Sequence, residues 1–309
     1  MAVYNNIGTE LSSVYGGGGS ELDYAYNSGG TQIYSKVIPP PPPPPVYEVG
    51  LNLLNSSYPC PQSPQGMATY GGYIFQYFST VQKMNIYLMS DYSLVSSISC
   101  NVIGHGNNLQ FGKVVQSSGF PLLYCSDSES ADARYIYVLS IDLISLSLVD
   151  TIVLPADVAN FPNGVIDFDN ERIYTVGYTA SSVYTTSGRN VVCVLDLNNP
   201  STVIATWDYA YLGVMQGLVW DGEHIVLNCN TYNGNKVTFY FINPTTHDID
   251  LEEQFDKEYQ SPLDSEYQGF SFEQSYYLVS KWVYKNYPES RSMYLEYYSY
   301  VPDWGEDET

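Results

Sequence analysis

Seven polar side chains recur at one kind of position, beside or near a glycine that opens a strand-like run. They are Gln65, His105, Asn107, Asn108, Asn163, Gln216 and Gln268. Amide side chains offer both hydrogen-bond donors and a carbonyl acceptor, so a ring of them could hold a sugar, another polar ligand or an ion. The same amides could instead bind neighbouring backbone and ordered water, and so close a crowded axis. Both interpretations stay open on the sequence alone.

Histidine is scarce, with 3 residues in the chain. His105 has no nucleophile partner and no metal-binding spacing such as HxxE or HExxH, which favours a structural role. His224 follows a turn and His247 lies in one, so both are expected to be exposed. No catalytic residue and no metal site are predicted from this set.

The elements that position these residues are short β-type runs. Residues 215–255 contain four such runs, separated by turn chemistry such as Asp221-Gly222 and the segment 243–246. One four-stranded meander cannot bury both faces of its sheet, so it needs similar units beside it. The strongest repeated signal is the third strand, where Tyr87, Tyr137, Cys193, Tyr240 and Tyr294 align.

These third strands recur at a period of about 50 residues, close to the period of roughly 40–50 that four-stranded propeller blades show. The sequence therefore predicts an all-β fold, a five-bladed β-propeller of four-stranded antiparallel blades. The blades are expected at residues 65–99, 104–154, 164–208, 215–255 and 267–300. The last blade lacks an obvious fourth strand. We expect residues 46–54 to supply it, because a ring must close or leave two edges exposed.

The domain organisation follows from composition. Residues 1–38 form a repetitive Gly/Tyr arm of β-type, and residues 39–45 are an unbroken proline run that predicts a stiff polyproline II spacer. The propeller takes residues 46–302, and residues 303–309 are an acidic tail. Two alternatives stay open: the arm could be a disordered low-complexity tail, and the proline run could be a ligand for an aromatic groove.

Charge and cysteine usage exclude several classes of partner. The net charge is −22, which argues against nucleic acid and anionic membranes. The charge could simply maintain solubility, and a structural calcium ion held by carboxylates is the alternative; no other cofactor is expected. The 5 cysteines lack a CxxC motif and are expected to be free thiols. Those in or next to strand runs, Cys100, Cys125, Cys193 and Cys229, are expected to be buried. No signal peptide and no membrane-spanning run are found.

Tyrosine is abundant, with 32 residues. Tyrosine side chains that alternate along strands pack across strands. The same amphipathic rings could also form a surface that binds sugars or protein partners. Packing is the favoured interpretation for any single tyrosine, and a binding surface is plausible for the group.

The arm resembles the short Gly/Tyr leader repeats that open tail and fibre proteins of phages and prophages of gut Gram-positive bacteria. The resemblance covers the repeats at Gly8-Thr9, Gly19-Ser20 and Gly30-Thr31 with their nearby tyrosines. It implies a virion protein, made in the host cytoplasm, whose arm docks on the particle. The propeller would then present a binding surface to a host glycan or protein receptor. A homo-oligomer through residues 1–38 is expected.

Two other functions stay open. Five-bladed propellers include glycoside hydrolases and lyases. The hydrolases place an acid, a base and a third carboxylate in the central funnel, and the nearest acids here are Asp127, Asp167, Asp169, Asp264 and Glu266. Asp167 and Asp169 alternate and so share a strand face, although Asp169-Asn170 also has turn chemistry. A structural particle protein without a ligand is the third hypothesis.

Overall fold

A computed structural model describes residues 64–127, 133–230, 236–256, 265–273, 276–285 and 290–299, together with five short strands nearer the N-terminus. These strands are β1 (Val3–Tyr4), β2 (Glu10–Leu11), β3 (Tyr24–Tyr26), β4 (Gln32–Ser35) and β5 (Leu54–Pro59). β1 pairs with β2, and β3 with β4. The chain divides into two compact units, Met1–Val46 and Tyr47–Thr309. The proline run 39–45 and the tail 303–309 lie outside the described residues.

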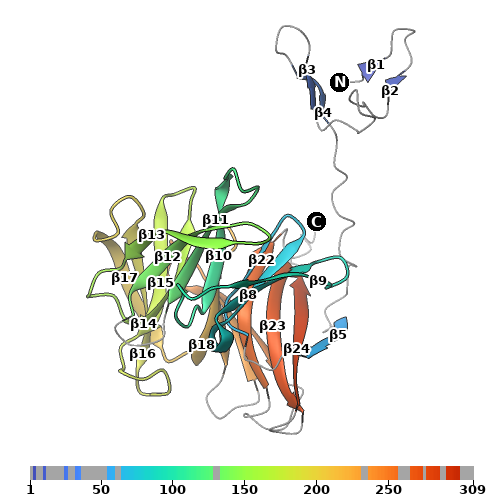
Figure 1. Ribbon diagram of the computed structural model, residues 1–309. Coiled ribbons are helices and arrows are strands. Elements are labelled where there is room, and N and C mark those ends of the chain that lie inside the picture. Colours follow the sequence, from blue (N-terminus) through green and yellow to red (C-terminus); the bar gives the residue numbers. More distant parts are fainter. Residues whose placement is uncertain are drawn as a thin grey trace, which may run out of the picture. The chain divides into compact units, whose positions relative to one another are not determined.

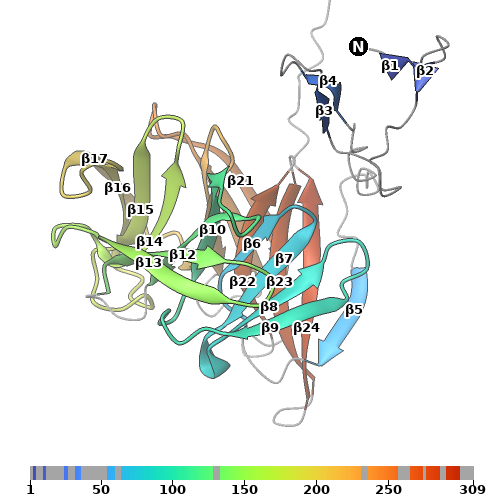
Figure 2. The same ribbon diagram turned by 45° about the horizontal axis from the view of Figure 1, so that its top comes forward.

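The larger unit is built of four-stranded antiparallel sheets (Figures 1 and 2). The first two contain β6 (Met67–Tyr70), β7 (Tyr73–Phe78), β8 (Lys83–Leu88) and β9 (Leu94–Ser99), then β10 (Asn108–Val115), β11 (Pro121–Asp127), β12 (Tyr135–Ile141) and β13 (Leu146–Val153). The next two contain β14 (Asn160–Asp167), β15 (Arg172–Tyr178), β16 (Arg189–Asp196) and β17 (Val203–Ala210), then β18 (Val214–Trp220), β19 (Ile225–Asn230), β20 (Lys236–Ile242) and β21 (Ile249–Asp256).

A further sheet has the order β22-β23-β24-β5, with β22 (Ser265–Glu273), β23 (Tyr276–Lys285) and β24 (Ser290–Ser299). The prediction of an all-β propeller with four-stranded antiparallel blades is confirmed. Within the described ranges the only helix is the 3-10 turn η1 (Ser79–Val81), and none is long and apolar enough to cross a membrane.

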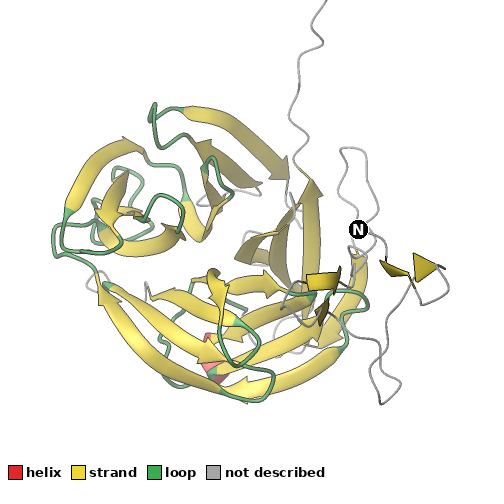
Figure 3. Cartoon of the chain, turned by 90° about the horizontal axis from the view of Figure 1, so that it is seen from above, coloured by secondary structure: helices red, strands yellow, loops and turns green. Residues whose placement is uncertain are grey.

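The sheets pack face to face around a common centre (Figure 3). Their first strands contact one another in the order β6, β10, β14, β18 and β22, and β22 contacts β6 in turn. Buried apolar clusters lie between neighbouring sheets. Phe75 and Leu123 share one, and Leu278 of β23 shares another with Met67 of β6. Burial between sheets therefore supplies the core that no single sheet could form.

Glycine is required where the first strands approach one another at the axis. A Cβ at Gly66 would lie 2.5 Å from the backbone oxygen of Gly106, and one at Gly269 would lie 2.6 Å from that of Gln65. A glycine after Gln therefore permits the backbones to approach closely at the crowded axis.

The strand that completes the last sheet lies later in the chain than the sequence predicts. β5 pairs with β24 through Pro59 with Ser292, Tyr58 with Met293 and Leu54 with Leu295. The predicted segment, residues 46–54, ends where β5 begins, and residues 46–53 lie outside the described residues. The error arose because an outer strand needs little apolar pattern. The polar β5 sequence, LNSSYP, gives a weaker β signal than the apolar residues before it.

Four cysteines, Cys100, Cys125, Cys193 and Cys229, are free and buried. Their burial confirms the prediction that they pack as small apolar side chains, and Cys60 lies outside the described residues. Burial raises the pKa of the Cys100 thiol from 9.0 to about 11 and that of the Tyr240 hydroxyl from 10.0 to about 12. It also raises the pKa values of Cys125 and Cys229.

These shifts predict alkaline destabilisation. The folded protein keeps protons on these groups that the unfolded chain starts to release near its ordinary thiol pKa of about 8.5–9. Stability is therefore complete below that pH and falls as the pH rises through about 11 for Cys100 and about 12 for Tyr240. Urea unfolding midpoints measured from pH 7 to pH 11 should fall above pH 9. A flat profile across that range would contradict the prediction.

Candidate functional site

The polar side chains predicted to form a ligand ring lie just before the first strands or within their first halves. Asn108 is the first residue of β10, and Gln65 is separated from the start of β6 by Gly66 alone. Gln216 is half-buried, whereas Asn107 and Asn163 are buried. The Gln268 side chain lies outside the described side chains.

Asn108 joins three sheets at the axis. Its Nδ2 donates to the backbone oxygen of Gly164 at 2.9 Å, and its Oδ1 accepts from the backbone N–H of Leu218 at 3.3 Å. The side chain is 1% exposed. Its amide therefore satisfies backbone groups on β14 and β18, which is the structural role that the sequence left open beside ligand binding.

The side-chain amides of Gln110 and Gln76 also bind backbone groups, although the sequence does not predict a role for either residue. Gln110 donates to the oxygen of Ile166 and accepts from the N–H of Ile166, both at 2.7 Å. Gln76 is fully buried, and its Nε2 donates to the oxygens of Gln65 and Gly66 at 2.9 and 3.0 Å. Neither lies beside the glycine signal that drew attention to the other amides.

Contacts of Asn163 and His105 are local to the second and third sheets. Asn163 accepts from the Ser126 hydroxyl at 3.4 Å. The His105 backbone N–H donates to Asp127 Oδ1 at 3.1 Å, which anchors the loop before β10. The imidazole of His105 is half-buried.

Asp167 and Asp169, the described members of the carboxylates considered for catalysis, have separate partners. Asp167 is 1% exposed, and its oxygens accept from the N–H groups of Asp169 and Asn170 and from Asn170 Nδ2. Asp169 is exposed and forms an ion pair with Lys113. β14 ends at Asp167 and a hairpin turn follows it, so the shared face predicted from alternation is wrong and the turn predicted at Asp169-Asn170 is confirmed. Asp264 and the Glu266 side chain lie outside what the structure describes.

A cavity of about 230 Å³ lies beside residues that follow these amides along the same first strands. It is lined by Ala68, Thr69, Tyr70, Leu109, Gln110, Phe111, Gly112, Val165, Leu218, Val219, Trp220, Ser271 and Phe272. These residues come from β6, β10, β14, β18 and β22, so all five first strands converge on it. We refer to it as the axial cavity.

The axial cavity has an apolar floor and a half-exposed aromatic mouth. Leu109, Val165 and Leu218 are each at most 2% exposed, whereas Tyr70 and Trp220 are half-buried. The Tyr70 ring lies 5.3 Å from that of Phe111, the Trp220 ring 5.1 Å from that of Tyr174, and the Phe272 ring 4.9 Å from that of Tyr277.

Two hydroxyl groups supply polarity in the wall of the axial cavity. Thr69 Oγ1 and Ser271 Oγ are 3.0 Å apart and hydrogen-bond across β6 and β22. The described lining residues carry no charged side chain. Aromatic rings with a few placed polar groups are the usual lining of small-molecule sites, so the cavity could hold a small, uncharged ligand.

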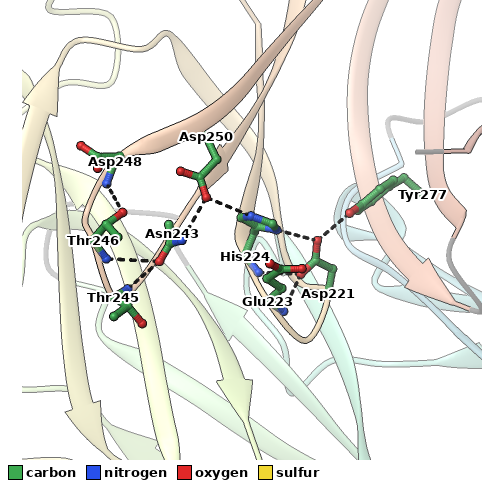
Figure 4. A network of polar contacts seen from close by, with 9 residues as sticks. All are labelled: Asp221, Glu223, His224, Asn243, Thr245, Thr246, Asp248, Asp250 and Tyr277. Atoms are coloured by element: carbon green, nitrogen blue, oxygen red, sulfur yellow. Dashed lines mark hydrogen bonds and ion pairs between the residues drawn. The ribbon is translucent and has the colours of Figure 1, made fainter. Parts of the chain in front are cut away.

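A second polar cluster joins the β18–β19 turn to its neighbours (Figure 4). Tyr277 donates to Asp221 Oδ2 at 2.7 Å and so links two sheets. His224 lies 3.5 Å from Asp221 through Nδ1 and 3.3 Å from Asp250 through Nε2. Its side chain is 12% exposed, so the prediction of an exposed His224 is wrong, because both ring nitrogens turn towards carboxylates. His247 is exposed, as predicted, and stacks on Trp207.

This cluster connects the β18–β19 turn to neighbouring strands and so has a structural role. The two nitrogens of His224 face different carboxylates, so the ring and both acids cannot converge on one metal ion. Among the described residues, no group of three or more His, Cys, Asp or Glu side chains could hold a metal. Asp221 Oδ1 also accepts from the N–H groups of Glu223 and His224, which fixes the turn itself.

No protein-family profile and no curated protein matches the chain. Among solved structures, the chain is similar to the PQQ-bound aldose sugar dehydrogenase of Streptomyces coelicolor, at 10% identity over 81% of this chain and 98% of that chain, with a TM-score of 0.47. It is also similar to the glutaminyl cyclase of Myxococcus xanthus, at 10% identity, 81% and 97% coverage and a TM-score of 0.45. With TM-scores below 0.5 and identities of 10%, no fold assignment, ligand or activity is inferred from these likenesses.

Proposed function

We propose that the protein is a binding module that presents its propeller to a host-surface receptor, with the axial cavity as the receptor-binding site. The observation that carries this proposal is the convergence of all five first strands on an uncharged, aromatic-lined cavity. Glycans fit such a lining, because their C–H faces pack on aromatic rings while their hydroxyls need hydrogen-bond partners. A protein receptor would have to insert a small side chain instead.

A five-bladed, closed ring is part of the same proposal. The sheet β22-β23-β24-β5 acts as the fifth blade and joins the fourth to the first. Three observations support it: β22 contacts both β18 and β6, Leu278 packs with Met67, and Ser271 hydrogen-bonds Thr69. Without this blade one wall of the axial cavity would be missing.

The phage setting of the proposal rests on the leader resemblance. In that setting residues 1–38 anchor the protein on a virion tail or fibre, and the proline run separates the propeller from the particle. The described strand pairs β1-β2 and β3-β4 are too small to bury a core alone, which favours packing on a partner or on copies of the arm.

Self-association through the arm is expected to appear in solution. Light scattering after size exclusion should give an oligomer mass for the full chain and a monomer mass for a chain that starts at Val46, because the second lacks the arm. Equal monomer masses for both chains would exclude the arm as an oligomerisation element.

Receptor binding should depend on Trp220. We expect Trp220→Ala to weaken binding of the full-length protein to a glycan array by about tenfold or more, since buried aromatic anchors dominate binding energy. Thr69→Phe, which fills the axial cavity and leaves Trp220 in place, should have a similar effect. Tyr135→Ala is the matched control, because Tyr135 is 40% exposed and lies outside the cavity lining.

Unfolding midpoints measured for every variant distinguish a loss of the binding site from a loss of the folded state. Glycan binding that is unchanged in both cavity variants would refute the axial cavity as the site. Glycan turnover, measured as release of reducing sugar and retained in both cavity variants, would instead favour the alternative of a glycoside hydrolase or lyase.

A further inference from the structure

We propose that the axial cavity takes a single neutral pyranose ring, the terminal residue of a glycan, and that the paired hydroxyls of Thr69 and Ser271 recognise its hydroxyl groups. This inference rests on the proposed function and names its ligand class. It depends on four properties of the cavity: its charge, its hydrogen-bonding groups, its rings and its size.

Charge excludes ionised sugars. The described residues that line the axial cavity are all uncharged, so an ionised carboxylate or ammonium would lose its hydration without gaining an oppositely charged partner. The chain as a whole carries a net charge of −22, which further repels sialic and uronic acids. A neutral sugar avoids both costs.

The hydroxyl groups of Thr69 and Ser271 can form more hydrogen bonds than the one between them. Each hydroxyl group has one donor and two acceptor positions. The contact between Thr69 Oγ1 and Ser271 Oγ uses one donor and one acceptor of the pair. One donor and the remaining lone pairs are therefore left for a ligand at the cavity wall. A sugar hydroxyl, which donates and accepts at the same carbon, matches this combination better than an ether or a carbonyl does.

The rings suit the apolar side of a pyranose. Four aromatic side chains line the axial cavity: Tyr70, Phe111, Trp220 and Phe272. Their faces carry partial negative charge, which attracts the weakly positive C–H groups of a sugar ring. All four rings are half-buried, so each keeps some surface that a ligand could contact.

Size limits the ligand to one ring. The volume of about 230 Å³ is below the roughly 300–1,000 Å³ of sites for drug-sized ligands. Behind the apolar floor, Asn108 bonds the N–H of Leu218 and occupies the axis. An oligosaccharide therefore cannot thread through, and only its terminal residue enters.

The test is a calorimetric titration of the full-length protein with methyl glycosides. Neutral methyl glucoside, galactoside and N-acetylglucosaminide are compared with methyl glucuronide, methyl sialoside and glucosamine. We expect saturable binding of at least one neutral glycoside, and at least tenfold weaker binding of every charged sugar. Ser271→Ala should weaken the neutral glycoside about three- to tenfold, the usual effect of one lost hydrogen bond.

The control is Thr206→Val, which removes a hydroxyl on β17 in a different part of the propeller and should leave the affinity unchanged. Equal or stronger binding of a charged sugar would overturn the inference, and so would unchanged affinity in Ser271→Ala. If charged glycans bind in a Trp220-dependent way, the proposed receptor site stands and only the neutral-sugar inference fails. If no glycan binds on the array or in solution, both fail.

Discussion

A chain that starts at residue 61 is expected to be less stable than one that starts at residue 53 by about 3 kcal/mol or more. Both lack the arm and the proline run, and they differ in β5. The pairing of β5 with β24 contributes several backbone hydrogen bonds, each worth roughly 1 kcal/mol net. Its loss also leaves β24 as an open edge, which promotes aggregation.

The measurement is urea unfolding monitored by tryptophan fluorescence, and light scattering detects aggregates. The chain from residue 53 serves as the matched control, because it keeps Leu54–Pro59. Equal unfolding midpoints for the two truncated chains would show that β5 does not close the last sheet.

Asn108→Leu is expected to lower the free energy of unfolding by about 2–4 kcal/mol. The substitution keeps the side-chain size but leaves the oxygen of Gly164 and the N–H of Leu218 without their partner. A buried group that loses its hydrogen bond costs about 1–3 kcal/mol, and two such groups are affected. The site is 1% exposed, so water cannot replace the amide easily.

Asn101→Leu provides the control for that substitution. Asn101 is exposed in the loop before β10, where a change should cost less than about 0.5 kcal/mol. Equal losses for the two variants would mean that the bridge across the axis contributes little. The sequence-based alternative, a ligand held by Asn108, would instead give a stability loss only when that ligand is present.

The sequence predicted the architecture well because its strongest signal is periodic. The third strand β20 is buried on both faces beyond its first residue, so it carries a dense β-branched and aromatic run, KVTFYFI. Outer strands show a weaker signal, since one face meets water. That is why the closing strand was placed at residues 46–54 and found at Leu54–Pro59.

The axial cavity could not be predicted in the same way. Its lining residues, such as Val219 and Phe272, are ordinary strand residues, and nothing in their spacing distinguishes a cavity wall from a packed core. The glycine signal points instead to positions such as Asn108, whose amide binds backbone groups of neighbouring sheets. Asp167 was misjudged for a related reason: strand alternation predicts a shared face only until the turn begins.

The most direct test of the account is a crystal structure of the full chain soaked with the glycan that binds best on the array. We predict a sugar ring in the axial cavity, in contact with Trp220 and within hydrogen-bonding distance of Thr69 or Ser271. A glycan bound instead beside Gln65 and His105, or on the outer surface of the blades, would contradict it.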